Sequence, residues 1–293
     1  MSIPALFQKG RVLSLEVFPP KPDAPIEVID GTLSLLAPIK PDYISVTYGA
    51  GGSGRSRSVE IAKKILPICD CLSHLTCVGA DAQEIDNVLD SLTAAGVENI
   101  MALRGDVPKD MDRESAFVHF KHASDLIEHI KDRGGFHVAA ACYPEGHPQS
   151  DYLEQDVDMV KRKVDAGAEL LVTQLFFDNV LFYRFMELLR KRGVTVPVTA
   201  GVMPVLNAAQ IVRMTLLSGT SVPPDLAKLI ARYGDNKEDF RKAGLEFAMN
   251  QVSGLMANGV QGIHLYTMNN PEVARRISGS IGSIVHCINE QED

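Results

Sequence analysis

Short apolar segments alternate with amphipathic segments along nearly the whole chain. Eight of the apolar segments end in glycine, proline or polar residues, which is typical of buried strands. They cover residues 12–18, 43–49, 72–79, 99–105, 137–143, 170–177, 196–202 and 262–268. Because a strand that is apolar on both faces needs cover on both faces, the pattern predicts parallel strands with helices packed against them.

Helical periodicity fills the intervals between these segments, and glycine follows most of the helical stretches, as at a helix C-terminus. The predicted helices cover residues 58–66, 82–95, 120–131, 152–166 and 179–191, and then 207–217, 224–233 and 237–258. We therefore predict a single catalytic domain over residues 1–293, a (β/α)8 TIM barrel with extra helices between strands 7 and 8. An open doubly wound sheet is the alternative, but eight units match barrel closure, and no GxGxxG motif follows the first strand.

Composition narrows the function classes. The 293 residues carry a formal net charge of −8, so we expect neither a nucleic acid nor an anionic membrane as partner. No apolar run reaches the roughly 18 residues of a membrane span, and the N-terminal segment does not resemble a signal peptide, so we expect a cytoplasmic protein. Five cysteines argue against a disulfide framework. Cys69 and Cys71 have no second pair at metal-ligand spacing, so no metal site is predicted.

Polar side chains interrupt the carboxyl ends of seven predicted strands, the end at which barrel enzymes carry their chemistry. The set comprises Glu16, Thr47, His74, Thr76, Arg104, Asp106, Tyr143, Glu145, His147, Thr173, Gln174, Asp178, Tyr266, Asn269 and Asn270. Burying such groups without partners costs about 1–3 kcal/mol each. A ring of them at one end therefore favours a ligand site over a polar core filled with water.

Glu16 is the strongest candidate for acid–base chemistry. It lies in the first predicted strand between apolar neighbours and is followed by Phe18, Pro19 and Pro20. Because burial disfavours the carboxylate form, we expect a raised pKa for Glu16, which suits a general acid. A salt bridge to a strand-end cation is the alternative.

Two further features have more than one interpretation. Asp106 stands two residues from Arg104, so the two side chains could simply form an ion pair. The glycine-rich run 49–54 suits a phosphate cradle and a tight strand-to-helix turn equally well.

Eight segments resemble methylenetetrahydrofolate reductases and occur in the order of that family. They are SLEVFPPK, DYISVTYGAGGS, HLTCVG, NIMALRGD, ACYPEGHP, KRKVDAGAELLVTQLFFD, GVMP and HLYTMNN. Without a C-terminal regulatory extension, the chain is expected to be of the short bacterial type. The resemblance implies reduction of 5,10-methylenetetrahydrofolate to 5-methyltetrahydrofolate, with FAD as cofactor and NADH or NADPH as electron donor.

The resemblance also implies roles for single residues. Glu16 matches the family's general acid, and Asp106 matches the catalytic acidic residue beside the flavin ring and the folate pterin. Gln174 and Gln210 match folate-contacting positions. The flavin-binding positions are Thr47, His74, Arg104, Gly105, Asp106, Tyr143, His147, Asp156, Arg162 and Lys163.

Some of these assignments have plainer alternatives, and two positions depart from the family pattern. Arg162 and Lys163 could complement a helix C-terminus, and Gln210 could be an exposed helix residue. Met214 stands where the family has a phenylalanine that stacks on ligand. Asn270 stands where the bacterial type has an arginine that reaches the folate tail.

These departures leave the electron donor open. We expect NADH, and a partner protein that delivers electrons is the alternative. The chain is accordingly expected to form a homo-oligomer or a complex with an electron-donating subunit. A barrel flavoenzyme of the proline-dehydrogenase type would instead need a cationic pocket for an amino-acid carboxylate, and a flavin-free barrel lyase is a third possibility.

Overall fold

Eight parallel strands close into a barrel in sequential order, and the last strand pairs back to the first. The structure, a computed structural model, describes residues 2–48, 55–107 and 111–292, so the glycine-rich run 49–54 lies outside the described residues. The strands are β1 (Val12–Val17), β2 (Tyr43–Val46), β3 (Asp70–Thr76), β4 (Asn99–Leu103), β5 (His137–Cys142), β6 (Leu170–Thr173), β7 (Val198–Val202) and β8 (Gly262–Tyr266). The predicted (β/α)8 barrel is confirmed.

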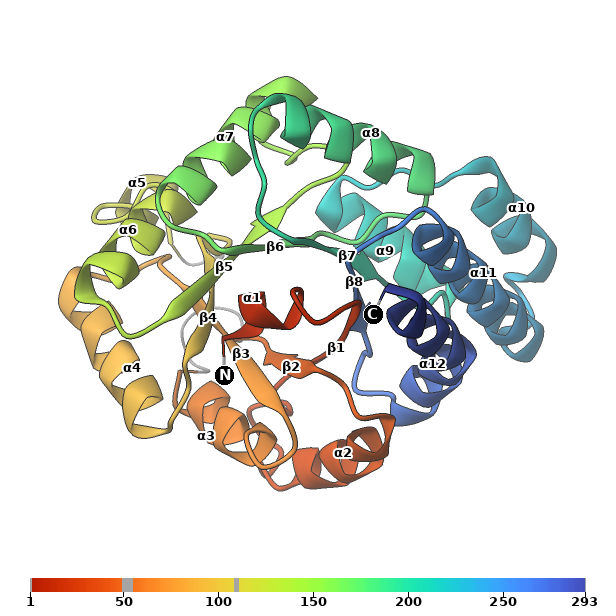
Figure 1. Cartoon of the computed structure of the whole chain (residues 1–293), viewed down its shortest axis with the longest axis horizontal. Coiled ribbons are helices and arrows are strands. Elements are labelled where there is room, and N and C mark those ends of the chain that lie inside the picture. The colour runs from red at the N-terminus through yellow and green to blue at the C-terminus, as the bar shows by residue number, and fades with distance from the viewer. Residues whose placement is uncertain (1, 49–54, 108–110, 293) are drawn as a thin grey trace.

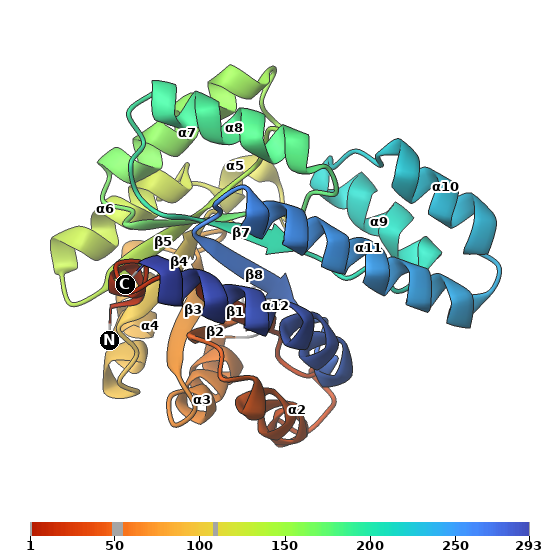
Figure 2. The same cartoon turned by 45° about the vertical axis from the view of Figure 1, so that its right-hand side comes forward.

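Helices surround the strands on all sides (Figure 1). They are α1 (Ile3–Leu6), α2 (Val28–Leu36), the short 3-10 helix η1 (Ala37–Ile39), α3 (Arg55–Ile65), α4 (Ala82–Ala94), α5 (Arg113–Ala116), α6 (Ala123–Arg133), α7 (Leu153–Asp165), α8 (Asn179–Lys191), α9 (Ala208–Ser218), α10 (Pro224–Tyr233), α11 (Lys237–Ala257) and α12 (Pro271–Glu292). The predicted extra helices follow β7, and α9, α10 and α11 lie together on one side of the barrel (Figure 2).

The barrel interior changes from apolar to polar along its axis. On β1, Leu13, Leu15 and Val17 pack outward into the main core between strands and helices. The alternate residues face inward, because side chains of a strand alternate. Val12 joins an apolar cluster with Ile3 of α1, which closes the amino ends of the strands. Farther along, Ser14 and Glu16 are buried polar groups, so the open end of the barrel is the polar end.

Strand β6 is shorter than predicted. The apolar run 170–177 suggested eight strand residues, but β6 ends at Thr173. Its pairing with β7 is limited to Leu171↔Val198 and Val172↔Thr199. The remaining apolar residues pack against helices instead, since Phe176 stacks on Phe182 of α8 with ring centroids 5.1 Å apart. Helix packing thus buries the end of this run, which sequence pattern alone does not distinguish from a strand.

Gly244 on α11 allows a close approach of that helix to Val205. A Cβ at Gly244 would lie 1.7 Å from the Val205 carbonyl oxygen, whereas a Cβ at the exposed Gly279 of α12 would meet nothing within 4 Å. We predict that Gly244→Ala lowers the free energy of unfolding by at least about 2 kcal/mol. Gly279→Ala should raise it by up to about 1 kcal/mol. Urea unfolding checks both variants, and a Gly244→Ala protein as stable as wild type would contradict this packing.

Candidate active site

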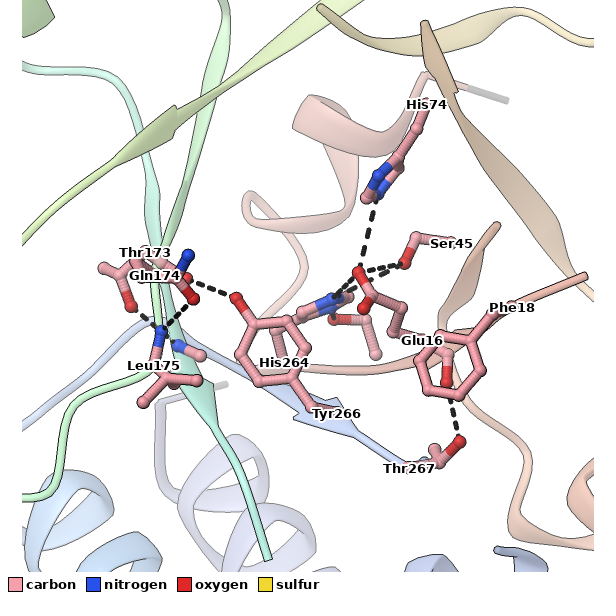
Figure 3. A network of polar contacts seen from close by, with 12 residues as sticks. Glu16, Phe18, Ser45, His74, Thr173, Gln174, Leu175, His264, Tyr266 and Thr267 are labelled. Carbon is pink, nitrogen blue, oxygen red and sulfur yellow. Dashed lines mark hydrogen bonds and ion pairs between the residues drawn. The ribbon is translucent and has the colours of Figure 1, made fainter. Parts of the chain in front are cut away.

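Glu16 lies inside the open end of the barrel, 8% exposed, among polar side chains from three other strands. Its Oε2 lies 3.5 Å from Nε2 of His74 on β3 and 3.5 Å from Nε2 of His264 on β8. Ser45 on β2 donates from Oγ to the same oxygen at 3.4 Å, and Ser14 Oγ lies 2.8 Å from His264 Nδ1. Figure 3 shows the imidazoles of His74 and His264 converging on this carboxylate. The cluster joins one carboxylate and two imidazoles.

The expectation of a raised pKa for Glu16 is wrong. Burial does raise it, but the hydrogen bond to His264 and the charges of His74 and His264 outweigh burial, and the pKa falls below its usual value. Burial lowers the pKa of His74, against the opposing charge of Glu16. The partners of the carboxylate are therefore two imidazoles and not the arginine or lysine considered from the sequence.

The segment that follows β8 fixes the backbone around Glu16. Thr267 donates from Oγ1 to the Glu16 carbonyl at 2.6 Å. Asn269 accepts from the Phe18 amide at 3.0 Å and donates to the Phe18 carbonyl at 2.9 Å. Met268 and Asn269 both have positive φ, 53° and 51°. Two successive non-glycine residues in the left-handed region cost of order 1–3 kcal/mol each, and such strain clusters at functional sites.

A cavity of about 370 Å³ opens at the ends of β4 and β5 and is covered by α7. It brings together seven of the ten predicted flavin-binding residues, namely Arg104, Gly105, Asp106, Tyr143, His147, Asp156 and Lys163. Sequence reasoning missed other side chains that line it, among them Arg113, His122 and Met159. Arg113 begins the short helix α5, His122 precedes α6 inside the predicted helix 120–131, and Met159 lies within α7. None of the three lies at the end of a predicted strand, where the candidate residues were sought.

Two ionisable side chains, Asp156 and Lys163, both lie in the lining of this cavity. Asp156 is 3% exposed, and its Oδ2 has no hydrogen-bond partner among the described residues. Burial raises the pKa of Asp156, although the charge of Lys163 opposes this. Lys163 donates to the Ala141 carbonyl at 2.8 Å, and burial lowers its pKa. An unsatisfied buried carboxylate oxygen is costly, so this one is well suited to accept from a ligand hydroxyl.

Rigid local geometry shapes the rim of the cavity. Gly105 has φ 87°, and a Cβ there would lie 2.6 Å from Cγ1 of Val78, so only glycine fits. Tyr143 packs edge-on against His147 with ring centroids 4.7 Å apart, and burial raises the pKa of Tyr143 to about 12. Asp106 lies exposed at this rim rather than in an ion pair with Arg104.

Three predicted flavin-binding residues do not line the cavity. His74 belongs to the Glu16 cluster. Thr47 is partly buried at the end of β2, where its amide donates to the Val17 carbonyl at 3.1 Å. Arg162 is exposed and donates to Asp125 at 3.0 Å on the outer surface. A surface ion pair is the plainer role for Arg162, since α6 and α7 meet there.

The two predicted folate-contacting glutamines lie on separate elements. Gln174 follows β6 at the barrel mouth; its amide donates to the Cys142 carbonyl at 2.7 Å, and its Oε1 accepts from the Leu175 amide at 2.8 Å. Gln210 lies in the first turn of α9, where its amide donates to the capping Asn207 at 3.1 Å. The structure describes no direct contact between the two glutamines.

The family model described as methylenetetrahydrofolate reductase matches residues 3–282 of this chain. The chain belongs to the methylenetetrahydrofolate reductase family. The 5,10-methylenetetrahydrofolate reductase of Escherichia coli (strain K12) is 32% identical over 277 residues, which cover 94% of this chain and 92% of that protein. Methylenetetrahydrofolate reductase (NADH) 1 of Zea mays is 33% identical and covers 94% of this chain. The chain spans 49% of that plant relative, about half its length.

A solved structure from Clostridium thermocellum shares the fold with a TM-score of 0.68 at 13% sequence identity. The superposition covers 96% of this chain and 97% of that chain. That protein is described as binding two copies of 5-methyl-5,6,7,8-tetrahydrofolic acid. At this identity the likeness shows the barrel fold alone.

In this methylenetetrahydrofolate reductase family member, the two departures from the family pattern have structural roles. Met214 on α9 is partly buried and packs against the apolar cluster that contains Leu175 and Ile211. Asn270 accepts from the Val273 amide at 3.3 Å and so caps the start of α12. Neither residue offers an aromatic face or a cation.

Sequence reasoning missed His264, although a signal for it exists. His264 alternates with the outward-packed Ile263 and Leu265, so the two-residue period of β8 places it inside the barrel. Within the described residues, no group of three or more His, Cys, Asp or Glu side chains could hold a metal ion. None of the described helices is long and apolar enough to cross a membrane.

The lowered pKa of His74 predicts acid-sensitive stability. Its folded-state pKa lies below the usual 6.5, so below that pH the unfolded chain binds more protons than the folded one. The free energy of unfolding should therefore fall as the pH drops from 7.5 to 5.5, with a contribution from His74 of at most about 1.4 kcal/mol per pH unit.

Urea unfolding at three pH values measures this dependence. His74→Gln should flatten it, and His119→Gln, at an exposed position, controls for the loss of one histidine. An unchanged pH dependence in His74→Gln would show that other groups titrate on unfolding.

Proposed function

We propose that this chain reduces 5,10-methylenetetrahydrofolate to 5-methyltetrahydrofolate, with FAD as cofactor and a reduced nicotinamide as electron donor. The observation that carries the proposal is the buried Glu16–His74–His264 cluster, which lies at the same end of the barrel as the cavity of Arg104, Asp156 and Lys163. Family membership supports it, as do the names of the Escherichia coli and Zea mays relatives. Because both sites belong to strand ends and α7, we propose that residues 1–293 act as a single catalytic domain.

The cavity at β4 and β5 fits FAD by its set of donors and acceptors. Arg104 and Lys163 would bind the diphosphate, since guanidinium and ammonium groups are the usual phosphate partners. The unpartnered Oδ2 of Asp156 would accept from a sugar or ribityl hydroxyl. Gly105 also lines this cavity, in a backbone conformation that favours glycine. FAD, when bound, supplies the hydride chemistry of the reaction.

Glu16 and the imidazoles beside it would supply the proton. The five-membered ring of the substrate opens when its carbon–nitrogen bond breaks, and the departing nitrogen must take up a proton. A lowered pKa leaves Glu16 ionised at neutral pH, so Glu16 must take up a proton before it can deliver one to the substrate nitrogen. His264, hydrogen-bonded to Ser14 on one side and 3.5 Å from Glu16 on the other, is placed to pass a proton through Glu16 to the substrate.

Asp106 and Gln174 would act on ligands at the rim. Asp106 is exposed at the edge of the cavity, and an ionised carboxylate there opposes the gain of negative charge nearby. Gln174 is partly buried at the barrel mouth, and we propose that its carboxamide contacts the folate. Gln210, one turn from Met214 on α9, is proposed as a second folate contact.

NADH is the proposed donor, and a partner protein is the second candidate. The Zea mays relative carries NADH in its name. One observation favours a protein partner or a second copy of this chain: α9, next to the proposed folate contacts, exposes Leu216 and Leu217 at 80% and 67%. Large apolar side chains that gather on a surface are typical of interaction sites.

An absorbance experiment on the purified chain tests the function directly. FAD is added, unbound FAD is removed, and NADH is supplied without oxygen. Loss of the flavin band with NADH and its return with 5,10-methylenetetrahydrofolate support the proposal. A protein that retains no FAD contradicts the cofactor assignment, whereas a flavin that NADH leaves oxidised points to a partner protein as donor.

Glu16→Gln should separate proton delivery from cofactor binding. Glutamine keeps the size of the side chain and its capacity for hydrogen bonds, but it supplies no proton at neutral pH. We predict that reoxidation by 5,10-methylenetetrahydrofolate slows by at least about 10²-fold, the usual contribution of general acid catalysis. Reduction by NADH should change by no more than a few-fold. Stopped-flow absorbance measures each step, and equal slowing of both would mean that Glu16 only holds the site together.

A further inference from the structure

A tyrosine side chain replaces a missing strand contact at the end of β6. The parallel pairing of β6 with β7 stops at Val172↔Thr199, one residue before Thr173. Beyond that point, the Gly201 amide donates to Thr173 Oγ1 at 2.9 Å. The Thr173 carbonyl accepts instead from the phenol of Tyr266 on β8, at 2.6 Å. The hydroxyl of Tyr266 thus crosses β7 to reach β6 (Figure 3).

Gly201 leaves the space that this contact needs. A Cβ at Gly201 would lie 2.4 Å from the Thr173 carbonyl oxygen and 2.8 Å from both Cε2 and the hydroxyl of Tyr266. Gly201 lies within β7 and does not have positive φ, so its missing side chain matters here and not its backbone freedom. Any larger residue would push the phenol away from β6.

The contact fixes one peptide group from both sides. The Thr173 carbonyl and the Gln174 amide belong to the same planar unit. The carbonyl accepts from Tyr266 at 2.6 Å, and the amide donates to the Cys142 carbonyl of β5 at 2.7 Å. Rotation of this unit would break both hydrogen bonds, so the direction in which the Gln174 side chain leaves the backbone is set by β5 and β8 together.

We propose that Tyr266 is a positioning residue that holds Gln174 for contact with the folate. The inference rests on the proposed function and deepens it. Tyr266 acts through the Thr173–Gln174 peptide, and its ring also meets His264 edge-on, with centroids 5.2 Å apart. One strand, β8, therefore carries both a member of the Glu16 cluster and the support for Gln174.

Tyr266→Phe tests the proposal, because it removes the hydroxyl and keeps the ring. Calorimetric titration of the FAD-loaded protein with 5-methyltetrahydrofolate gives the dissociation constant without need of an electron donor. We expect Tyr266→Phe to weaken binding about threefold to tenfold, the effect of one lost hydrogen bond. If Tyr266 acts through Gln174, the same substitution should add no further weakening in a Gln174→Ala background.

Tyr183→Phe is the matched control. Tyr183 on α8 also donates its hydroxyl to a backbone carbonyl, that of Gly254 at 3.0 Å, on the outside of the barrel. This variant should lose comparable thermal stability and bind 5-methyltetrahydrofolate as wild type does. Equal weakening by Tyr266→Phe with and without Gln174 would overturn the proposal, as would unchanged binding in the single variant. Wild-type protein that binds no 5-methyltetrahydrofolate would refute the proposed function itself.

Discussion

The buried carboxylate of Glu16 determines which residues must surround it. An ionised group taken out of water costs several kcal/mol unless charge and hydrogen bonds compensate. The register of the strands places the compensating groups. Glu16 of β1 lies opposite Ser45 of β2 and opposite Tyr266 of β8, and Ser14 of β1 lies opposite His264 of β8. A shift of one residue in β1 would turn Glu16 out of the barrel and bring Leu15 or Val17 in. Register therefore fixes both the core and the chemistry.

The β8–α12 connection then secures this arrangement at the mouth. Thr267 binds the Glu16 carbonyl, and Asn269 binds both polar groups of the Phe18 backbone. These bonds compensate for the strained backbone of Met268 and Asn269. Glu16 is therefore held at the mouth by its main chain as well as by the contacts of its carboxylate.

The barrel could be predicted from sequence because its strands are apolar on both faces and end in turn residues. The lengths of the strands were less predictable. The apolar run 170–177 continues into residues that helices cover, whereas β6 itself ends at Thr173. The set of cavity residues was also largely predictable, since strand ends and the resemblance indicated the same positions. The position of Arg162 outside the cavity could not be predicted, because its partner Asp125 lies on another helix, far from Arg162 in the sequence.

The pKa of Glu16 shows why local sequence is insufficient for chemistry. Its neighbours Leu15 and Val17 suggest an apolar pocket, yet they pack outward, and the side chains that face Glu16 come from residues 45, 74 and 264. Burial and charge act on the same group in opposite directions, and only the fold shows which effect is larger. The sequence could single out the carboxylate as a candidate, but the direction of its pKa shift depends on contacts between distant strands.

Strand β8 carries residues for both proposed roles of the barrel mouth, proton delivery and folate contact. His264 and Tyr266 alternate along this strand with Leu265, which packs outward into the main core. A displacement of β8 would move the imidazole relative to Glu16 and the phenol relative to Thr173 at the same time. Substitutions at these two positions share a strand and an aromatic contact, so their effects should not add independently. Leu265 packs into the main core and so anchors β8, the strand from which His264 reaches Glu16 and Tyr266 reaches Thr173.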